Sequence, residues 1–269
     1  MGITLGIIGA GNMGMVILRG ALEADVLSAQ TTVVADVEPA RREEAARLGC
    51  QTTADAADLA GVGQIILAVK PQGFQGVAGA LGTLKGPTVV ISIMAGLGSR
   101  EIRAALGPAA RVIRVMPNTP SQVGAGMAAI AVGDGAQPGD ETLAVAIFEA
   151  LGRTVIVDEA LMHAVTAVSG SGPAYVFLLA EAMEQAGVGL GLDPDTARLL
   201  VTQTILGAGK LLDEADRTSS ELRATVTSPG GTTEAALREM DRRELSGIVR
   251  DAITAARDRA AQLESEGSS

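Results

Sequence analysis

Aromatic side chains, cysteine and long apolar runs are all scarce in this sequence. Its 269 residues include 3 Phe, 1 Tyr and no Trp, so the core has to be built from Ala, Val, Ile, Leu and Met. Cys50 is the single cysteine, which excludes an internal disulfide and indicates a reducing compartment. No apolar run is long enough to cross a bilayer and no cleavable leader is recognisable. We therefore expect a cytoplasmic protein with no membrane partner.

Basic residues are also in deficit. There are 21 Lys and Arg against 31 Asp and Glu, which gives a formal net charge of −10. A protein that binds nucleic acid needs a basic face for the phosphates, so the charge balance argues against that class. A small anionic substrate stays possible, because the N-terminus of a helix can hold an anion locally.

The residue types of common catalytic sites are sparse as well. His163 is the sole histidine and falls in a helical stretch, where a structural role is favoured over that of a general base. No cluster has metal-ligand spacing, and no nucleophile is paired with a base. Hydroxyl groups and glycine-rich backbone remain, and they gather at Thr166–Tyr175 and Thr227–Thr233.

Short apolar segments alternate with helical patterns through the first part of the chain. This alternation predicts an α/β fold with an N-terminal Rossmann-type, doubly wound parallel sheet. The expected strands are Ile3–Gly9, Thr32–Asp36, Gln64–Val69, Thr88–Ile91, Arg111–Val115, Gly126–Val132 and Thr154–Val157. The expected helices are Met13–Glu23, Pro39–Leu48, Phe74–Leu81, Arg100–Leu106 and Glu141–Leu151.

After about Asp158 only helical patterns remain. We expect a dinucleotide-binding domain at 1–158 and an all-α substrate-binding and dimerisation domain at 159–269. The expected helices are Pro173–Gly187, Asp193–Leu212 with Asp193 as N-cap, Glu234–Met240 and Arg243–Leu263, with a frayed end at 264–269. Pro173–Gly187 is apolar on nearly every face, which indicates burial against a second copy of the chain or, alternatively, within the monomer.

The segment Gly9–Gly14 follows a predicted strand and opens a predicted helix, as a dinucleotide-binding motif requires. Gly9 permits the tight turn, Gly11 the approach of the pyrophosphate, and Gly14 the close packing of helix on strand. Asn12 and Met13 begin the helix, whose free N–H groups would face the phosphates. The first domain is therefore predicted to bind NADH or NADPH.

Asp36 ends the second predicted strand, at the spacing where an acid binds the adenine ribose hydroxyls. A carboxylate there would repel the additional phosphate of NADPH, which favours NADH. Arg41 and Arg42 lie close downstream and could offset this repulsion, or they could be solvated residues of a helix.

Two later segments end strands at the same edge of the predicted sheet and are further candidates for coenzyme contacts. Ala68, Val69, Lys70 and Pro71 follow the third predicted strand, and Asn118 follows the fifth. Lys70 could face the nicotinamide or be a solvated charge. Asn118 offers donors and an acceptor, although Asn beside prolines is also a common turn residue.

Five motifs in order give the sequence a specific resemblance. They are Gly9–Gly14, Ala68–Gln72, Met116–Pro120, Thr166 with Ser169–Tyr175, and Ser228–Thr233. Together they resemble the Δ1-pyrroline-5-carboxylate reductase family, from residue 3 to about residue 260. The resemblance implies NAD(P)H-dependent reduction of a cyclic imine, 1-pyrroline-5-carboxylate, to L-proline, which is the last step of proline biosynthesis.

The resemblance also implies roles for residues of the second domain. Ser228 and Thr233, with the backbone N–H groups of Gly230, Gly231, Thr232 and Thr233, would hold the substrate carboxylate. Thr166 would lie near the imine nitrogen as a proton donor or relay. The family further implies a homodimer of C-terminal helices, often assembled into a larger ring.

Two points stay open at the level of the sequence. Family members that use NADPH tend to carry small or basic residues where this chain has Asp36, so the preferred coenzyme is undecided. The alternative function is that of a related two-domain NAD(P)-dependent dehydrogenase or an imine reductase acting on another small carboxylate substrate. A hydroxy-acid dehydrogenase of this kind generally needs a lysine or histidine base on the first helix after the sheet, and Pro173–Gly187 has no lysine. A nucleotide-binding protein without catalysis is the remaining possibility.

Overall fold

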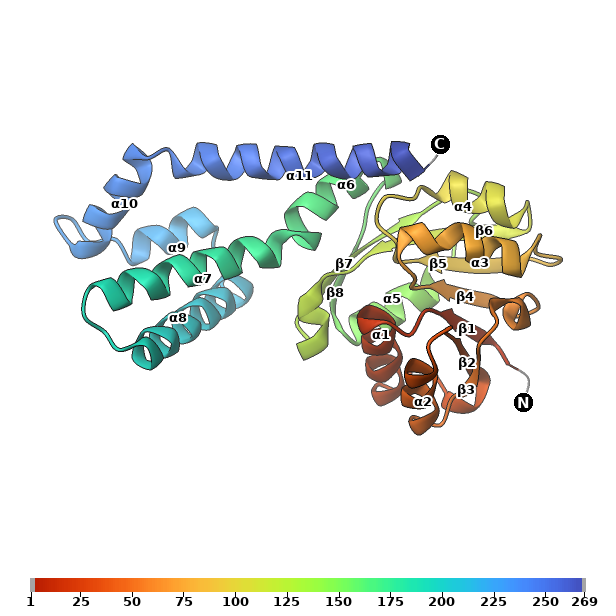
Figure 1. Ribbon diagram of the computed structural model, residues 1–269. Helices are drawn as coiled ribbons and strands as arrows, with labels where there is room; N and C mark the ends of the chain where they lie inside the picture. Colours follow the sequence, from red (N-terminus) through yellow and green to blue (C-terminus); the bar gives the residue numbers. More distant parts are fainter. Residues whose placement is uncertain (1–2, 268–269) are drawn as a thin grey trace. The chain divides into compact units, whose positions relative to one another are not determined.

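The computed structural model describes residues 3–267 and divides into two compact units (Figure 1). The sheet unit comprises the residues up to Ser171 together with those from Ala255 onward, and the helical unit comprises Gly172–Thr254. The segment from residue 159 to Ser171, which the sequence assigned to the helical domain, is thus grouped with the sheet by its contacts. None of the helices among residues 3–267 is long and apolar enough to cross a membrane.

The sheet unit is built on eight strands in the order β3-β2-β1-β4-β5-β6-β7-β8. The strands are β1 Leu5–Ile8, β2 Thr32–Ala35, β3 Gln51–Thr53, β4 Gln64–Leu67, β5 Thr88–Ser92, β6 Ala110–Met116, β7 Gly126–Val132 and β8 Gly152–Ile156. Neighbouring strands run parallel except for β6 and β7. The Rossmann-like sheet is confirmed, with one antiparallel pair that the sequence did not indicate.

The reversal between β6 and β7 follows from the length of their connection. Only residues 117–125 join the two strands. A parallel crossover needs about a dozen residues or more, usually with a helix, so this short connection returns the chain beside β6 in the opposite direction. The sequence prediction also missed β3, because its three residues are polar and partly exposed.

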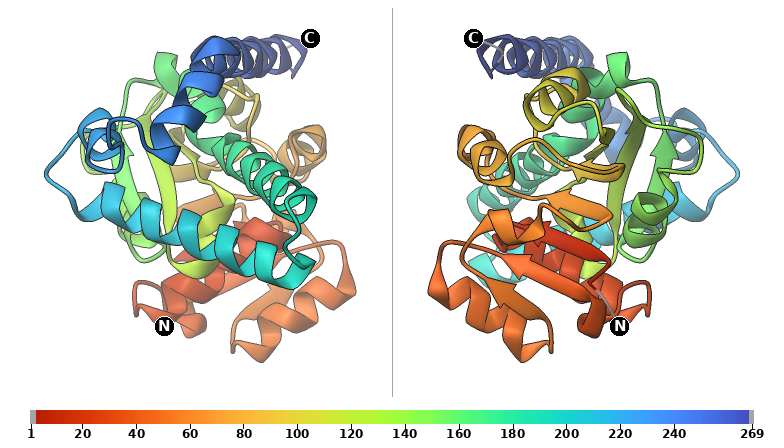
Figure 2. Two further views of the ribbon diagram at one scale, coloured as in Figure 1. Left: turned by 90° about the vertical axis from the view of Figure 1, so that its left-hand side faces the viewer. Right: turned by 90° about the vertical axis from the view of Figure 1, so that its right-hand side faces the viewer.

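Helices cover both faces of the sheet (Figure 2). They are α1 Asn12–Glu23, α2 Pro39–Arg47, α3 Phe74–Leu81, α4 Ser99–Leu106 and α5 Thr142–Glu149. Ile17 of α1 and Phe148 of α5 belong to the apolar core on one face. Phe74 of α3 and Ile102 of α4 belong to the core on the other face. The central strands are thus buried on both sides, which explains why they are apolar without alternation.

The helical unit contains α7 Gly172–Gly189, α8 Pro194–Glu214, α9 Ser219–Thr225, α10 Thr232–Arg242 and the first part of α11 Leu245–Gly267. The predicted cap of α8 is confirmed, because the Asp193 carboxylate accepts a hydrogen bond of 3.0 Å from the Thr196 N–H. The sequence prediction missed α9. Its capping box, in which Thr218 and Glu221 bond to each other's backbone, matches a pattern readable from sequence.

Helix α7 has no buried residue in the single chain. The side chains of Phe177 and Leu178 are 65% and 66% exposed, and several large apolar side chains of α8 are exposed as well. Burial of α7 within the monomer, one of the two sequence-based alternatives, is therefore wrong. Exposed apolar surface on this scale marks an interaction site in a soluble protein.

An ionic network around the buried Arg114 side chain holds the end of α11 within the sheet unit. Arg114 of β6 is 7% exposed, and its guanidinium lies 3.0 Å from the Glu159 carboxylate and 3.4 Å from that of Glu264. His163 Nε2 lies 3.4 Å from the same Glu264 oxygen. The backbone N–H and the hydroxyl of Ser99 also donate to Glu159. Glu264 is thus held in place, although the sequence led us to expect a frayed end from this residue onward.

Because of this network, the free energy of unfolding is expected to depend on pH in the acid range. Burial opposes the ionisation of Glu159, but the hydrogen bonds from Ser99 and Arg114 outweigh it and hold the pKa below its ordinary value. The ionised form therefore stabilises the folded state at pH values above the unfolded-state pKa of about 4.3, and this contribution is lost as the pH falls through the lower folded-state pKa. We expect urea melts to show stability falling below about pH 4.5. The variant Glu159→Gln should weaken that dependence, whereas Glu43→Gln on the exposed face of α2 should leave it unchanged.

Candidate active site

The glycine-rich turn after β1 has room only for backbone at two of its positions. Gly9 has a φ of +100°, and a Cβ there would lie 2.7 Å from the Ala68 carbonyl oxygen. A Cβ on Gly14 would lie 2.1 Å from the Gly9 carbonyl oxygen. A Cβ on Gly11 would meet nothing within 4 Å, so this position faces open space. The turn therefore packs tightly against β4 and is open at Gly11, where the pyrophosphate is predicted to approach.

This turn leads into a free helix N-terminus at the point where the strand order reverses. The chain runs from β1 to β2 and β3 on one side of β1 and then crosses to β4 on the other side. The first backbone bond of α1 runs from the Met15 N–H to the Gly11 carbonyl at 2.9 Å, and Gly11 offers no side-chain cap. The N–H groups of Asn12, Met13 and Gly14 thus have no acceptor within the helix. Such a position suits the diphosphate of a dinucleotide, so the residues present fit a nicotinamide coenzyme.

Asp36 follows β2 directly and its carboxylate joins two loops. One oxygen accepts a hydrogen bond of 2.7 Å from the Ala10 N–H in the glycine-rich turn. The other accepts one of 2.9 Å from the Glu38 N–H. The sequence placed Asp36 beside the coenzyme, and the structure does bring it to the glycine-rich turn.

Neither arginine that follows Asp36 is simply solvated. The Arg42 guanidinium donates to the carbonyl oxygens of Asp36 and Val37, at 2.7 and 2.9 Å. Arg41 forms ion pairs with Glu38 at 3.9 Å and with Glu44 at 3.5 Å. Both arginines are therefore bonded to carbonyl or carboxylate groups of the segment from Asp36 to Glu44.

Ala68, Val69, Lys70 and Pro71 continue from β4 along the same edge. The Ala68 N–H donates to the Ile8 carbonyl at 2.8 Å, which places this segment beside the glycine-rich turn. Lys70 is exposed and precedes the 3₁₀ turn Pro71–Gly73. The structure thus brings together the candidate coenzyme residues of the segments after β1, β2 and β4.

Thr166 lies in an unusual helical segment. Helix α6 Met162–Val165 runs into a π-turn, Thr166–Gly170, in which the Ser171 N–H donates to the Thr166 carbonyl five residues earlier, at 2.8 Å. The Thr166 hydroxyl donates to the Met162 carbonyl at 2.8 Å. Single π-turns inside helices are found frequently at functional sites. Nothing in the sequence pattern had predicted this one.

The loop Ser228–Thr233 belongs to the helical unit and leads into α10. Gly230 has a φ of +72°, and a Cβ on Gly231 would lie 2.4 Å from the Ser228 hydroxyl oxygen. Helix α10 begins after Gly231 with no side-chain cap, so its first N–H groups have no acceptor within the helix. This arrangement can bind a carboxylate.

Sequence reasoning missed the part that an acidic residue in the first turn of α10 plays beside this loop. The Glu234 carboxylate accepts a hydrogen bond of 2.7 Å from the Gly230 N–H and lies 3.0 Å from the Arg238 guanidinium. A Glu three residues after a helix N-cap often reaches back in this way, so the signal was available. Glu234 therefore fixes the loop and takes up one of the N–H groups assigned to the substrate carboxylate.

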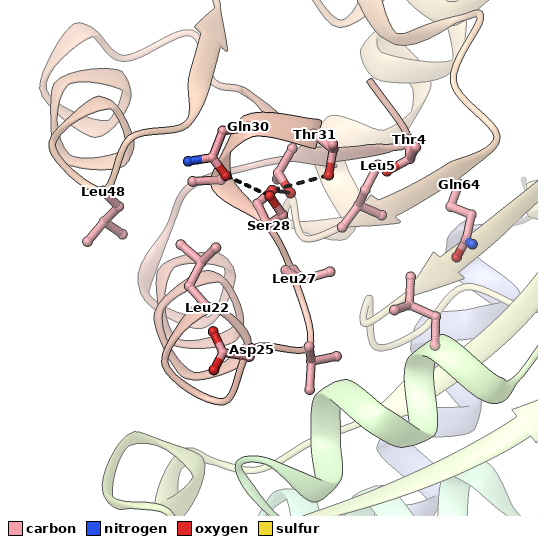
Figure 3. Close-up of a pocket in the computed structure, with 14 residues that line it drawn as sticks. Thr4, Leu5, Leu22, Asp25, Leu27, Ser28, Gln30, Thr31, Leu48 and Gln64 are labelled. Carbon is pink, nitrogen blue, oxygen red and sulfur yellow. Dashed lines mark hydrogen bonds between the residues drawn. The ribbon is translucent and has the colours of Figure 1, made fainter. Parts of the chain in front are cut away.

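A hollow of about 610 Å³ lies elsewhere, at the amino ends of β1, β2 and β4 (Figure 3). Thr4, Leu5, Thr31 and Gln64 are among the residues that line it. Its polar groups are partly bonded to one another: the Ser28 hydroxyl donates to Gln30, and the Thr31 hydroxyl donates to the Ser28 carbonyl. Ligands of open α/β sheets bind at the carboxyl ends of the strands, so this hollow is separate from the candidate site.

Comparisons with known families agree with these features. The sequence profile of the family described as "Pyrroline-5-carboxylate reductase dimerisation" matches residues 159–263. A second profile, "NADP oxidoreductase coenzyme F420-dependent", matches residues 4–96, which contain the glycine-rich turn and Asp36. The two matches cover the helical and the nucleotide-binding portions of the chain.

Several relatives match over nearly their whole length. The pyrroline-5-carboxylate reductase of Synechocystis is 38% identical over 98% of this chain and 99% of its own, and that of Pasteurella multocida is 39% identical over 96% of both. A solved structure of the enzyme from Coxiella burnetii is 34% identical, with a TM-score of 0.90 over 97% of this chain and 98% of its own. One from Plasmodium falciparum with NADP bound is 28% identical, with a TM-score of 0.86 over 97% of this chain and 98% of its own. This chain therefore belongs to the pyrroline-5-carboxylate reductase family.

Proposed function

We propose that the protein reduces 1-pyrroline-5-carboxylate to L-proline with a reduced nicotinamide coenzyme. The observation that carries the proposal is the occurrence, in a member of this family, of a dinucleotide cradle at Gly9–Gly14 together with a carboxylate-binding loop at Ser228–Thr233. When bound, the reduced coenzyme supplies a hydride to the carbon of the C=N bond, whose nitrogen gains a proton and becomes the ring amine.

The residues of the sheet unit hold and orient the coenzyme in this proposal. The free N–H groups at the start of α1 bind the diphosphate, and Asp36 binds the adenine ribose. Ala68, Val69, Lys70 and Pro71 flank the nicotinamide half. Thr166 gives or relays the proton that the imine nitrogen takes up. Because a threonine hydroxyl is a weak acid, most of the rate enhancement comes from alignment of the reacting carbons.

The residues of the helical unit hold the substrate carboxylate. The Ser228 and Thr233 hydroxyls and the free N–H groups of Thr232 and Thr233 donate to it, and the left-handed turn at Gly230 shapes the loop. Helices of the same unit form the homodimer through the exposed apolar side chains of α7 and α8. Assembly of dimers into a larger ring is part of the same proposal.

The test is a steady-state assay of the purified protein. Oxidation of NADH or NADPH on addition of 1-pyrroline-5-carboxylate, with L-proline as product, is the expected result. No turnover with either coenzyme would overturn the proposal. Turnover of a small 2-hydroxy acid or of a different cyclic imine instead would favour the alternative dehydrogenase or imine reductase.

The coenzyme preference is predicted to be NADH. The Asp36 carboxylate is held in place by the N–H groups of Ala10 and Glu38, so it cannot turn away from a ribose phosphate without losing these bonds. Arg41 and Arg42, the nearby cations, are engaged elsewhere.

The variant Asp36→Ser should therefore raise kcat/KM with NADPH relative to NADH by about tenfold, which corresponds to about 1.4 kcal/mol. Glu43→Gln, which removes an exposed carboxylate from α2, is the control for a general charge effect and should leave the ratio unchanged. A wild-type protein that prefers NADPH would contradict the prediction.

A further inference from the structure

Asn118 uses its side chain to join three segments of the sheet unit. It follows β6 and precedes the 3₁₀ turn Thr119–Val123, but its side chain does not cap that turn. The amide oxygen instead accepts a hydrogen bond of 2.9 Å from the Met127 N–H at the start of β7. The amide nitrogen lies 3.2 Å from the carbonyl oxygen of Ser169 in the π-turn and 3.4 Å from the hydroxyl of the same residue.

The Ser169 carbonyl cannot receive the usual α-helical hydrogen bond. In an α-helix this carbonyl would accept from the N–H four residues later, and that residue is Pro173, which has no N–H. A carbonyl that is withdrawn from water without a donor is unfavourable, and Ser169 is half-buried. The Asn118 amide supplies a donor in place of the N–H that Pro173 lacks.

A second contact fixes the same turn against the end of β6. A Cβ on Gly170 would lie 2.4 Å from the terminal methyl of Met116, so the methionine packs directly on the glycine backbone. Met116 and Asn118 therefore hold Gly170 and Ser169, the last two residues of the π-turn. Thr166 is the first residue of that turn, and its carbonyl closes the π bond with Ser171.

The end of β6 lies at the same edge of the sheet as the glycine-rich turn, because β6, β5, β4 and β1 are parallel. We propose that Asn118 is a positioning residue, rather than a coenzyme ligand, and that it holds the π-turn and its Thr166 hydroxyl at this edge. The catalytic part of the inference rests on the proposed function. Its structural part, the attachment of the π-turn by one amide, does not.

Two substitutions distinguish the hydrogen bond that the Asn118 side chain accepts from the one that it donates. Asn118→Asp keeps an oxygen for the Met127 N–H but removes the donor and sets a carboxylate against the Ser169 carbonyl. Asn118→Leu removes both bonds at similar size. Gln122→Ala, at an exposed residue of the same connection with no hydrogen bond among the contacts described, is the matched control. Thermal melts establish that each variant is folded.

Four measurements decide the outcome. Amide hydrogen exchange should rise in the segment 162–171 of both Asn118 variants, with the segment around β1 unchanged. The coenzyme Kd, from titration of the fluorescence of the reduced nicotinamide, should stay within about twofold of the wild-type value. The kcat should fall by about 10- to 100-fold, and the kinetic isotope effect on kcat with 4-deuterated coenzyme should rise, because hydride transfer becomes slower than product release.

Each contrary result is distinct. A coenzyme Kd raised tenfold or more, with kcat retained at saturation, would make Asn118 a direct coenzyme ligand and overturn the proposal. Unchanged exchange in 162–171 would overturn the attachment itself. If the wild-type protein does not reduce the imine, the proposed function fails, while the exchange measurement still decides whether Asn118 holds the π-turn. If Asn118→Leu does not fold, Asn118→Asp decides alone.

Discussion

Replacement of Thr166 by valine is expected to lower kcat by about 10²- to 10⁴-fold, the range for loss of a positioned proton donor. Valine keeps the branched shape and the backbone, so the π bond from the Ser171 N–H to the residue 166 carbonyl is retained. Only the hydroxyl is removed. That hydroxyl donates to the Met162 carbonyl in the structure, so it has to turn away from this acceptor before it can donate to an imine nitrogen.

Steady-state kinetics with saturating coenzyme check this expectation. Thr166→Ser retains the hydroxyl and should recover most of the activity, whereas Thr233→Val should raise KM for the imine more than it lowers kcat. The coenzyme Kd should be the same in all three variants. A Thr166→Val enzyme with wild-type kcat would show that water or the protonated imine itself supplies the proton.

Replacement of Arg114 by leucine is expected to lower the free energy of unfolding by about 3–5 kcal/mol. Arg114 is the cation between Glu159 and Glu264, and its own side chain is almost fully buried. Its removal leaves two partly buried carboxylates close together without the guanidinium that lies between them. Repulsion between them should then release the end of α11 from the sheet unit.

Urea unfolding at neutral pH measures this loss. Arg19→Leu is the matched control, because Arg19 pairs with Glu44 at 2.7 Å on the exposed surface and such pairs contribute little to stability. The triple variant with Glu159→Gln and Glu264→Gln should recover part of the stability by removing the two carboxylate charges. A loss below about 1 kcal/mol for Arg114→Leu would mean that the buried network behaves like a surface pair.

Most of the fold could be predicted from the sequence, because its signals are local. The apolar strands, the glycine-rich turn and the cap at Asp193 each depend on neighbouring residues, and the helix Phe74–Leu81 begins and ends where predicted. The direction of β7 depends on the length of a connection, and the pattern of apolar residues does not record it. The position of Thr166 within the sheet unit depends on contacts that the sequence does not display.

For the candidate site, too, local features could be predicted from the sequence and contacts between distant residues could not. Residues in local motifs, such as Gly9–Gly14 and Ser228–Thr233, could be selected from sequence with a reason for each. The bonds between distant residues could not. Asn118 was selected as a possible coenzyme contact, but its partner Ser169 lies 51 positions away. Glu264 was expected to fray because its pairing with Arg114 spans 150 positions.

The aromatic deficit has an optical consequence near the π-turn. With no tryptophan and a single tyrosine, the protein's absorption at 280 nm and the fluorescence excited there come from Tyr175 alone. This residue lies in the first turn of α7, a few positions after Gly170. Its phenol is therefore a natural single-site spectroscopic probe of that junction, and the emission of a bound reduced nicotinamide can be recorded against a background free of indole fluorescence.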